Sequence, residues 1–418
     1  MVSRSLRGGS DHSMNVLILG LNYAPEPVGI GPYTAGTAEF LAAAGHKVTV
    51  VCGKPYYPDW KVQESYRKPG VLYSVENGVQ VRRVPIYVPS KPSGGRRLVH
   101  HASFALRAFP EMVRAARAEK PDVVMCIAPS LISMVAARAI ARMFGAKVWV
   151  HVQDFEVEAA FATGLLKDRG IVATAARGFE QWCLKGGMVS TISPQMCAKL
   201  RELGVPDARI YQFRNWANID NIKPLERPSV YRERWNITTP HVALYSGNLG
   251  NKQGIEIIPE VARLLSDRRD VTFVICGNGA SRDRLIAAAE GLSNVQFQDL
   301  QPAEMMSDLL GLATVHLLPQ IAGAADLVLP SKLANMLASG RAVLATASPG
   351  TGLAREVEGC GQVVAPEDAV AMARVLESLL DDEGARHAYG LAGRARAEDR
   401  WRRQSILGDF EVAMGLYR

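Results

Sequence analysis

The sequence predicts an α/β protein with two doubly wound domains that face each other across a cleft. Short apolar runs alternate with helical patterns along the whole chain, which is typical of parallel sheets covered by helices on both faces. This alternation is interrupted at residues 216–240, where periodicity is lost. The length of 418 residues is sufficient for two domains of ordinary size.

The first series of apolar runs predicts the strands of an amino-terminal domain at residues 14–220. A helical pattern at residues 32–44 follows the first of these runs. Residues 1–13 have neither periodicity nor the apolar core of a signal peptide, so we expect a disordered leader or a cloning remnant. The expected strands are residues 16–20, 47–51, 79–85, 122–127, 147–152, 188–192 and 210–213.

A second series of apolar runs predicts a carboxyl-terminal domain at residues 221–395. Residues 216–240 contain three prolines and mixed charges, which is typical of a linker. Residues 396–418 are helical and basic at first, and we expect them to pack back across both domains. The expected strands are residues 242–246, 271–276, 295–297, 315–318, 343–345 and 362–364.

The composition of the chain limits which partners, metal sites and membrane segments can be expected. The formal charge of +7 favours an anionic partner, which includes nucleic acid, an acidic membrane or a phosphate-bearing small molecule. Nucleic acid is disfavoured because aromatic residues are 7% of the chain and its basic charge is spread over many helices. The six cysteines lack CxxC spacing, so we expect free thiols rather than a zinc site or disulfides. No apolar run is long enough to span a membrane.

Glycine turns and lysines gather at the predicted carboxyl ends of the second domain's strands. Lys332 lies in the first turn of a predicted helix, where the helix dipole disfavours a cation unless an anion accompanies it. Lys252 lies beside another glycine turn. We therefore predict that a diphosphate binds at this edge of the sheet. The turn and helix-start residues assigned to it are Gly247, Asn248, Gly250, Gly277, Pro330 and Ser331.

Two features of the first domain are further candidates. Gly29 and Gly31 follow the first strand without completing GxGxxG, so they form either a loop that approaches a phosphate or sugar, or merely a tight turn. His151 and Asp154 end a buried strand. His151 is either a structural residue or a catalytic residue facing the cleft, and Asp154 either orients His151 or contacts a sugar hydroxyl.

Residues 96–118 predict a basic amphipathic helix. Such a helix either lies on an anionic membrane or is a crossover helix with an ordinary solvated face. Its basic and apolar residues are Arg96, Arg97, Arg107, Arg114 and Arg117, and Leu98, Phe104, Leu106, Phe109, Met112 and Val113.

Several segments, taken together and in order, resemble glycosyltransferase family 4 over residues 14–415. They are AEFLAAAGHKVTVV, VSTISPQM, FRNWANID, GNLGNKQGIEII, CGNG and PSKLANMLASGRAV. The resemblance implies two Rossmann-like domains of the GT-B type. It also implies a retaining transfer from a nucleoside diphosphate sugar, with no metal and no cofactor.

The segments LNYAPEPVGIGPYT, VQDFEVEAAF and LVLPSKLANMLASGR resemble the fucosyltransferase branch of colanic-acid and related exopolysaccharide assembly. This resemblance implies transfer of fucose from GDP-fucose to a lipid-linked oligosaccharide, with GDP-mannose and UDP-sugars as alternative donors. It also implies a cytoplasmic enzyme that is peripheral on the inner face of the plasma membrane.

The resemblance also places donor-site residues. The family's two donor-site glutamates, eight positions apart, fall on Leu327 and Asn335. We expect Asn335 to bond a ribose hydroxyl and Asp326 to replace the first glutamate. The family's phosphate-binding cations fall near Asn248 and Gln253, and we expect Lys252 and Lys332 to replace them. The nucleotide base is expected near Asp299 and Leu300.

Two other functions fit the same fold. A nucleotide-sugar epimerase needs a concentration of acid and base groups, for which the cleft offers mainly His151 and Asp154. A non-catalytic nucleotide-sugar-binding protein is the other alternative, because both family glutamates are missing.

Overall fold

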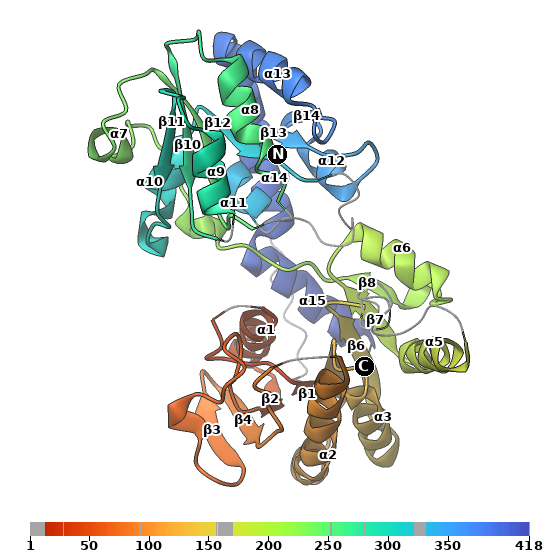
Figure 1. The fold of residues 1–418 in the computed structure, drawn as a ribbon. Helices are drawn as coiled ribbons and strands as arrows, with labels where there is room; N and C mark the ends of the chain where they lie inside the picture. The colour runs from red at the N-terminus through yellow and green to blue at the C-terminus, as the bar shows by residue number, and fades with distance from the viewer. Residues whose placement is uncertain are drawn as a thin grey trace. The chain divides into compact units, whose positions relative to one another are not determined.

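The computed structural model describes residues 13–27, 29–91, 94–155, 157, 170–250, 253–279, 281–321 and 332–417. The chain forms two compact units, each with its own sheet (Figure 1). The first unit contains the chain up to Asn215 together with the residues from Leu407 onward. The second unit runs from Trp216 to Ile406. Both units have the α/β architecture predicted from the sequence.

The first unit has an eight-stranded sheet in the order β3-β4-β2-β1-β5-β6-β7-β8. All neighbouring strands are parallel except β3, which is antiparallel to β4 at the edge. The strands are β1 Asn15–Gly20, β2 Lys47–Gly53, β3 Leu72–Glu76, β4 Val79–Val84, β5 Val123–Ala128, β6 Lys147–Val152, β7 Met188–Thr191 and β8 Ile210–Gln212.

Helices of the first unit cover this sheet. The long helix α2 packs against α3 as well as against β1 and β2. The last residues of the chain also belong to this unit, where Phe410 stacks on Phe213 with ring centroids 4.0 Å apart and meets Trp149 edge-on. The helices are α1 Gly31–Ala43, α2 Gly94–Glu119, α3 Ser133–Phe144, α5 Ile171–Leu184, α6 Pro194–Glu202 and, at the carboxyl terminus, α15 Arg403–Tyr417.

The second unit has a six-stranded parallel sheet in the order β11-β10-β9-β12-β13-β14. Counted from β9, this is the 3-2-1-4-5-6 order of a dinucleotide-binding fold. The strands are β9 His241–Ser246, β10 Val271–Cys276, β11 Val295–Gln298, β12 Val315–Leu318, β13 Ala342–Thr346 and β14 Gly361–Val364.

Two apolar clusters show that both faces of this sheet are covered. In β13, Leu344 belongs to a cluster with residues of α8 and α13, whereas Val343 and Ala345 belong to a cluster with residues of α11 and α14. Successive side chains of a strand point to opposite faces, so each cluster lies on its own face. The helices are α7 Tyr231–Arg234, α8 Ile257–Leu264, α9 Arg282–Ala288, α10 Met306–Gly311, α11 Lys332–Ala338, α12 Gly352–Val357, α13 Ala369–Asp381 and α14 Glu383–Trp401.

The structure differs from the sequence prediction at three elements. The edge strand β3 was missed, because its apolar Tyr73 and Val75 are exposed while Ser74 and Glu76 bond the buried Arg83. Helix α8 begins at Ile257, whereas the sequence after Lys252 predicts a helix that starts near Gln253. The carboxyl-terminal residues form two helices, α14 and α15, separated at position 402, where the backbone is extended.

Two further predictions concern the cysteines and membrane spans. All six cysteines are buried free thiols, as predicted. In the part of the chain that the structure describes, no helix has the length and apolar character needed to cross a membrane.

Candidate active site

The strand order of the second unit locates its ligand crevice. Chain connections leave in opposite directions from β9 and β12, which are neighbours in the sheet. In open α/β sheets, ligands bind outside the carboxyl ends of the strands at this switch point. The turn after β9 begins at Gly247 and the segment after β12 begins at Pro319, so these two segments border the crevice.

Glycines allow the turns after β9 and β10 to lie in backbone contact. A Cβ atom on Gly277 would lie 1.9 Å from the Gly247 carbonyl oxygen, and one on Gly279 would lie 2.5 Å from the Leu249 carbonyl oxygen. The backbone N–H of Leu249 donates to the carbonyl of Asn278 at 2.9 Å. Larger residues at positions 277 and 279 would therefore separate the two turns.

The ammonium of Lys332 lies against the turn after β9. Its Nζ donates to the Tyr245 hydroxyl at 2.7 Å and to Gln253 Oε1 at 3.2 Å. It also lies 3.2 Å from the position a Cβ atom would take on Gly247. Lys332 begins α11, so helix α11 and strand β9 together bring this cation to the switch point.

The electrostatics of Lys332 are unusual for a lysine. Burial lowers the pKa of Lys332 to about 8. Both of its hydrogen-bond partners are neutral, since Tyr245 keeps its proton: burial raises the pKa of the phenol, whose hydroxyl donates to the Asn248 carbonyl at 2.7 Å. Among the described residues, Lys332 has no carboxylate partner. The cation is therefore partly buried, and none of the described residues supplies its counter-charge.

Asn335, Asp299 and Leu300 are also described. Asn335 lies one turn beyond Lys332 in α11, and its buried Oδ1 accepts no hydrogen bond from the described residues. Asp299 forms an ion pair with Arg282, with Asp299 Oδ1 and Arg282 Nη2 3.1 Å apart. The side chain of Leu300 is exposed.

The structure brings some of the predicted donor-site residues together. Gly247, Asn248, Gly250 and Gly277 form the adjoining turns, and the Lys332 ammonium lies against Gly247. Sequence reasoning missed Tyr245, which has the pattern of an ordinary buried strand residue. The predicted residues Lys252, Asp326, Pro330 and Ser331 lie outside the described residues, and their roles stay predictions.

In the first unit, Gly29 and Gly31 follow β1, whose neighbour β5 marks the switch point of that sheet. Their loop is tied down by Glu26, a buried carboxylate that sequence reasoning missed. Glu26 Oε1 accepts from the backbone N–H groups of Tyr56 and Tyr57 at 2.9 and 3.0 Å. A Cβ atom on Gly31 would lie 3.1 Å from Glu26 Cβ, so the glycine allows this close packing. Burial raises the pKa of Glu26.

His151 is buried at the end of β6, and both of its ring nitrogens are bonded. Nδ1 lies 2.9 Å from Ser190 Oγ, and Nε2 lies 2.9 Å from Gln153 Nε2. Because the Gln153 amide donates, Nε2 is the acceptor, which assigns the ring proton to Nδ1. Burial lowers the pKa of His151 to about 3, so the imidazole is neutral at physiological pH.

These contacts are relevant to the structural role and to the catalytic role predicted for His151. Ser190 and Gln153, rather than Asp154, orient the ring, and Gln153 is in turn bonded to Asn215 by two hydrogen bonds of 2.9 Å. Such pairing on both nitrogens is what a structural histidine requires. Asp154 is exposed, and one of its oxygens accepts from the N–H of Phe155 at 2.9 Å. A catalytic role for either residue stays a prediction.

The predicted basic helix is α2, which is partly a core element. Phe104 and Met112 are fully buried, so they are not part of a surface stripe. Large apolar side chains nevertheless remain exposed on the helix, with Leu106 75% and Leu98 60% exposed. Arg114 forms an ion pair with the buried Glu111. The exposed arginines of α2 are Arg96, Arg97, Arg107, Arg114 and Arg117.

The described residues contain no group of three or more His, Cys, Asp or Glu side chains with metal-binding geometry. The described polar groups predicted to meet a ligand in the second unit are the Lys332 ammonium, the side-chain oxygen Oδ1 of Asn335 and the backbone of the glycine turns.

Two family models match the chain. The glycosyl transferase 4-like domain matches residues 28–216, and the glycosyl transferases group 1 model matches residues 229–396. A putative colanic acid biosynthesis glycosyl transferase, WcaI of Escherichia coli (strain K12), is 40% identical over 380 residues. That similarity covers 88% of this chain and 92% of the relative.

Solved structures share the fold. Sucrose-phosphate synthase from Thermosynechococcus elongatus superposes with a TM-score of 0.70 at 17% identity, covering 96% of this chain and 99% of the other. Anabaena Alr3699/HepE, solved in complex with UDP and glucose, has a TM-score of 0.63 at 13% identity with the same coverage. These likenesses confirm the predicted GT-B fold class.

The two matched domains and the E. coli relative show the family of the chain. The chain belongs to the glycosyltransferases that join a glycosyl transferase 4-like domain to a group 1 domain, as its resemblance to glycosyltransferase family 4 predicted.

Proposed function

We propose that this chain is a retaining, metal-independent glycosyltransferase that moves a sugar from a nucleoside diphosphate to a lipid-linked oligosaccharide in exopolysaccharide synthesis. The observation that carries the proposal is the Lys332 ammonium, which lies at the switch point of the second unit with no carboxylate partner among the described residues. A leaving diphosphate would supply the missing negative charge.

The proposed chemistry follows from what such a site offers. Departure of the nucleoside diphosphate places negative charge on the phosphates, and fixed cations and backbone dipoles stabilise that charge without a metal. Lys332 would donate a charged hydrogen bond to a phosphate oxygen, and the turn at Gly247, which lies against its ammonium, would approach the same ligand. Lys252 and Ser331 complete the proposed diphosphate site. The leaving phosphate takes the proton of the acceptor hydroxyl during front-face attack, so no dedicated base is assigned.

For the donor, we propose GDP-fucose, with GDP-mannose and UDP-sugars as the alternatives to be tested. The proposal draws on the E. coli relative, whose name assigns it to colanic acid biosynthesis. Anabaena Alr3699/HepE, which shares the fold, was solved with UDP and glucose. In this chain, Asn335 would bond the ribose through its unpaired Oδ1, and Asp299 and Leu300 would lie near the base.

For the acceptor, we propose that the first unit supplies the binding residues. His151 and Asp154 end or follow β6 at the carboxyl edge of its sheet, whereas Gly29 and Gly31, which follow β1, stay donor-site candidates. With both ring nitrogens bonded, His151 would position neighbouring groups rather than transfer a proton. The exposed apolar and basic residues of α2 would hold the protein on the inner face of the plasma membrane, where a lipid-linked acceptor is found.

The test is incubation of the purified chain with radiolabelled nucleotide sugars and a lipid-linked oligosaccharide, in the presence of EDTA. Transfer of label to the lipid fraction supports a glycosyltransferase, and the anomeric configuration of the product, read by NMR, decides between retention and inversion. Epimerised nucleotide sugar would indicate the epimerase alternative. Binding without turnover would indicate a non-catalytic nucleotide-sugar-binding protein, and loss of transfer in EDTA would refute metal independence.

A further inference from the structure

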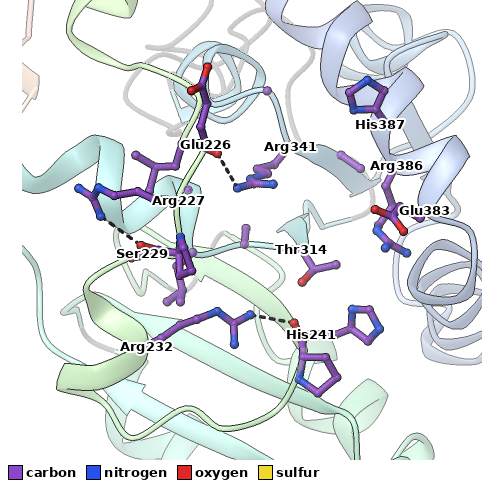
Figure 2. Close-up of a pocket in the computed structure, with 18 residues that line it drawn as sticks. Glu226, Arg227, Ser229, Arg232, His241, Thr314, Arg341, Glu383, Arg386 and His387 are labelled. Carbon is purple, nitrogen blue, oxygen red and sulfur yellow. Dashed lines mark hydrogen bonds between the residues drawn. The ribbon is translucent and has the colours of Figure 1, made fainter.

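A cavity lies at the amino ends of the strands of the second sheet, whereas the glycine turns lie at their carboxyl ends. Figure 2 shows the residues that line this cavity. Its volume is about 470 Å³, and it is bordered by His241 and Ala342, the first residues of β9 and β13, and by Thr314, which precedes β12. Strand β9 runs from His241 to Ser246, and a strand rises about 3.3 Å per residue. The strands therefore separate this cavity from the turn at Gly247 by their full length.

Three arginines of this cavity, Arg232, Arg341 and Arg386, have no acidic partner among the described residues. Each guanidinium has five N–H groups in a planar fork, of which these contacts use only some. We call this space the basic cavity. The three side chains donate to backbone carbonyls: Arg232 to Thr239 and Pro240 at 2.7 and 2.8 Å, Arg341 to Leu225 at 3.3 Å, and Arg386 to Leu379 and Leu380 at 2.7 and 2.6 Å.

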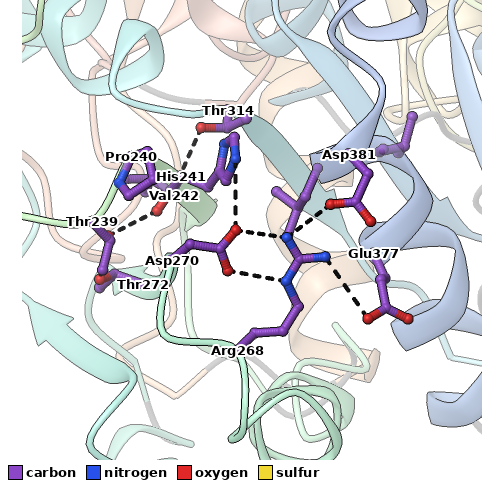
Figure 3. A network of polar contacts seen from close by, with 12 residues as sticks. Thr239, Pro240, His241, Val242, Arg268, Asp270, Thr272, Thr314, Glu377 and Asp381 are labelled. Atoms are coloured by element: carbon purple, nitrogen blue, oxygen red, sulfur yellow. Dashed lines mark hydrogen bonds and ion pairs between the residues drawn. The ribbon is translucent and has the colours of Figure 1, made fainter.

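Nearby carboxylates are already engaged by other arginines. Asp270, Glu377 and Asp381 surround Arg268, with Asp270 bonded through both of its oxygens (Figure 3). None of these three acids forms an ion pair with Arg232, Arg341 or Arg386 in the described part of the chain.

The rim of the cavity provides little compensation. Arg227 is bonded to both oxygens of Asp308 at 2.9 and 3.1 Å, so that arginine is neutralised. The carboxylates of Glu226 and Glu383 are exposed, and the Glu226 carboxylate points away from Arg341 in Figure 2. Exposed carboxylates compensate a neighbouring cation weakly, because water screens them.

Burial makes this arrangement costly for the protein alone. The Nε atom of Arg341 is buried and has no hydrogen-bond partner in the described part of the chain. Burial lowers the pKa of Arg341, and the positive charge of Arg232 lowers it further. Burial also lowers the pKa of Arg232. Like charges in a partly desolvated space with unused donors are stabilised when an anion enters.

We propose that the basic cavity binds a small phosphate-bearing anion through Arg232, Arg341 and Arg386. The planar guanidinium fork matches two phosphate oxygens at a time, so several arginines around one tetrahedral anion use the donors that backbone carbonyls leave free. A volume of about 470 Å³ lies within the range of small-molecule sites and holds a phosphate with an attached sugar. The site is separate from the donor site and does not depend on the proposed sugar transfer.

The proposal is tested by isothermal titration of the full chain with inorganic phosphate at constant ionic strength. We expect saturable binding that chloride does not reproduce. Arg341→Gln and Arg386→Gln should each weaken it about tenfold or more, which corresponds to the loss of one charge-assisted hydrogen bond. Circular dichroism establishes that each variant is folded.

Two control variants separate this cavity from other sources of phosphate binding. Arg227→Gln removes an arginine from the same rim whose charge Asp308 already neutralises, so phosphate binding should be unchanged. Lys332→Met removes the cation of the proposed diphosphate site, so phosphate binding that persists in this variant belongs to the basic cavity. If a hexose phosphate displaces inorganic phosphate, a phosphorylated sugar is a ligand of the cavity. If it does not, the ligand is the free phosphate ion. The proposal is overturned if phosphate does not bind, if both cavity variants bind it normally, or if Lys332→Met abolishes binding.

Discussion

The Lys332 ammonium lies 2.7 Å from the Tyr245 hydroxyl, and this pair joins the start of α11 to the end of β9. Neither this hydroxyl nor the Gln253 amide oxygen carries a negative charge to balance the ammonium. The free protein therefore bears the desolvation of a cation that its described residues do not neutralise. A residue placed in this way should cost stability in the absence of ligand and contribute to function in its presence.

Lys332→Met should separate these two effects. We expect the thermal unfolding midpoint at pH 7 to rise by a few degrees, because methionine fills similar space without a charge to desolvate. We expect the turnover number for sugar transfer to fall by about 10²–10³, the usual effect of removing one fixed contact to a developing negative charge. Calorimetry and steady-state kinetics measure the two quantities.

The matched control is Lys223→Met, which removes an exposed lysine of the same unit. That variant should change neither the unfolding midpoint nor the turnover number appreciably. A Lys332→Met enzyme with near-normal turnover would remove Lys332 from the proposed diphosphate site, whatever its effect on stability.

Nucleoside diphosphate affinity should depend on pH through Lys332. Its pKa of about 8 means that the ammonium is charged below pH 8 and increasingly neutral above it. Because a bound diphosphate favours the charged form, affinity should fall as pH rises through 8. Isothermal titration with GDP across this range gives the profile.

Lys332→Arg provides the control for this pH effect, since a guanidinium does not titrate below pH 12. If the planar guanidinium does not fit the site, the variant should bind GDP more weakly than the wild type at pH 7. Its affinity for GDP should nevertheless not fall between pH 7.5 and 9. A fall of the same size in the wild type and in this variant would assign the titration to another group.

His151 should affect acid stability. Its pKa is about 3 in the folded protein and near 6.5 when unfolded, so the unfolded chain binds the additional proton between these values. This group therefore lowers stability as pH falls below about 6.5. His151→Gln should be less stable than the wild type at pH 7, yet should lose less stability between pH 6.5 and 5. Urea unfolding at each pH measures this.

Kinetics of the same variant test its other predicted role. If His151 acts through packing and its bonds to Ser190 and Gln153, the folded variant should keep its turnover number within about tenfold. A larger fall, with an unchanged unfolding midpoint, would instead support the catalytic role predicted from the sequence.

The central strands of both sheets were predictable because they are nearly continuous apolar runs. Strand β5 is buried at every position, and such a run needs no tertiary information to be recognised. Strand β3 shows the limit of this reasoning. Its inward side chains, Ser74 and Glu76, are polar because they bond Arg83, and Arg83 itself is 2% exposed. Polar side chains that bond a buried arginine on the adjoining strand give no local hydrophobic pattern.

Residues of the candidate site could be predicted only where the backbone geometry requires one residue type. Gly247 and Gly277 could be found because a turn in close backbone contact requires glycine. Tyr245 could not, because its hydroxyl becomes significant only when α11 brings Lys332 beside it. Glu26 was missed for the same reason, since its partners Tyr56 and Tyr57 lie about thirty residues away in the sequence.

Gly277→Ala should unfold or strongly destabilise the second unit. The added Cβ would lie 1.9 Å from the Gly247 carbonyl oxygen, and the φ of 152° is one that alanine rarely adopts. We expect a loss on the order of 3 kcal/mol or more, from overpacking added to backbone strain. Gly291→Ala is the control, because its φ of 81° carries strain while nothing lies within 4 Å of the new Cβ. If both variants lose the same stability, the contact between the two turns is not what requires glycine at position 277.

The exposed face of α2 should determine membrane binding. Leu106 and Phe109 are 75% and 36% exposed, and Arg107 lies between them. Sedimentation with vesicles containing anionic phospholipid should show binding at low salt that weakens as ionic strength rises. The double variant Leu106→Glu and Phe109→Glu should lose this binding, because it places two negative charges where apolar side chains would enter the interface.

A control for this surface comes from the other unit. Leu264 is 53% exposed on α8, so Leu264→Glu adds a negative charge at a comparable exposed leucine. If α2 is the binding surface, Leu264→Glu should sediment with vesicles like the wild type, while Arg107→Gln should weaken binding by about fivefold, as expected for one basic residue near an anionic surface. Equal losses in all three variants would indicate a general effect of net charge, and full binding by the α2 double variant would exclude this helix as the membrane contact.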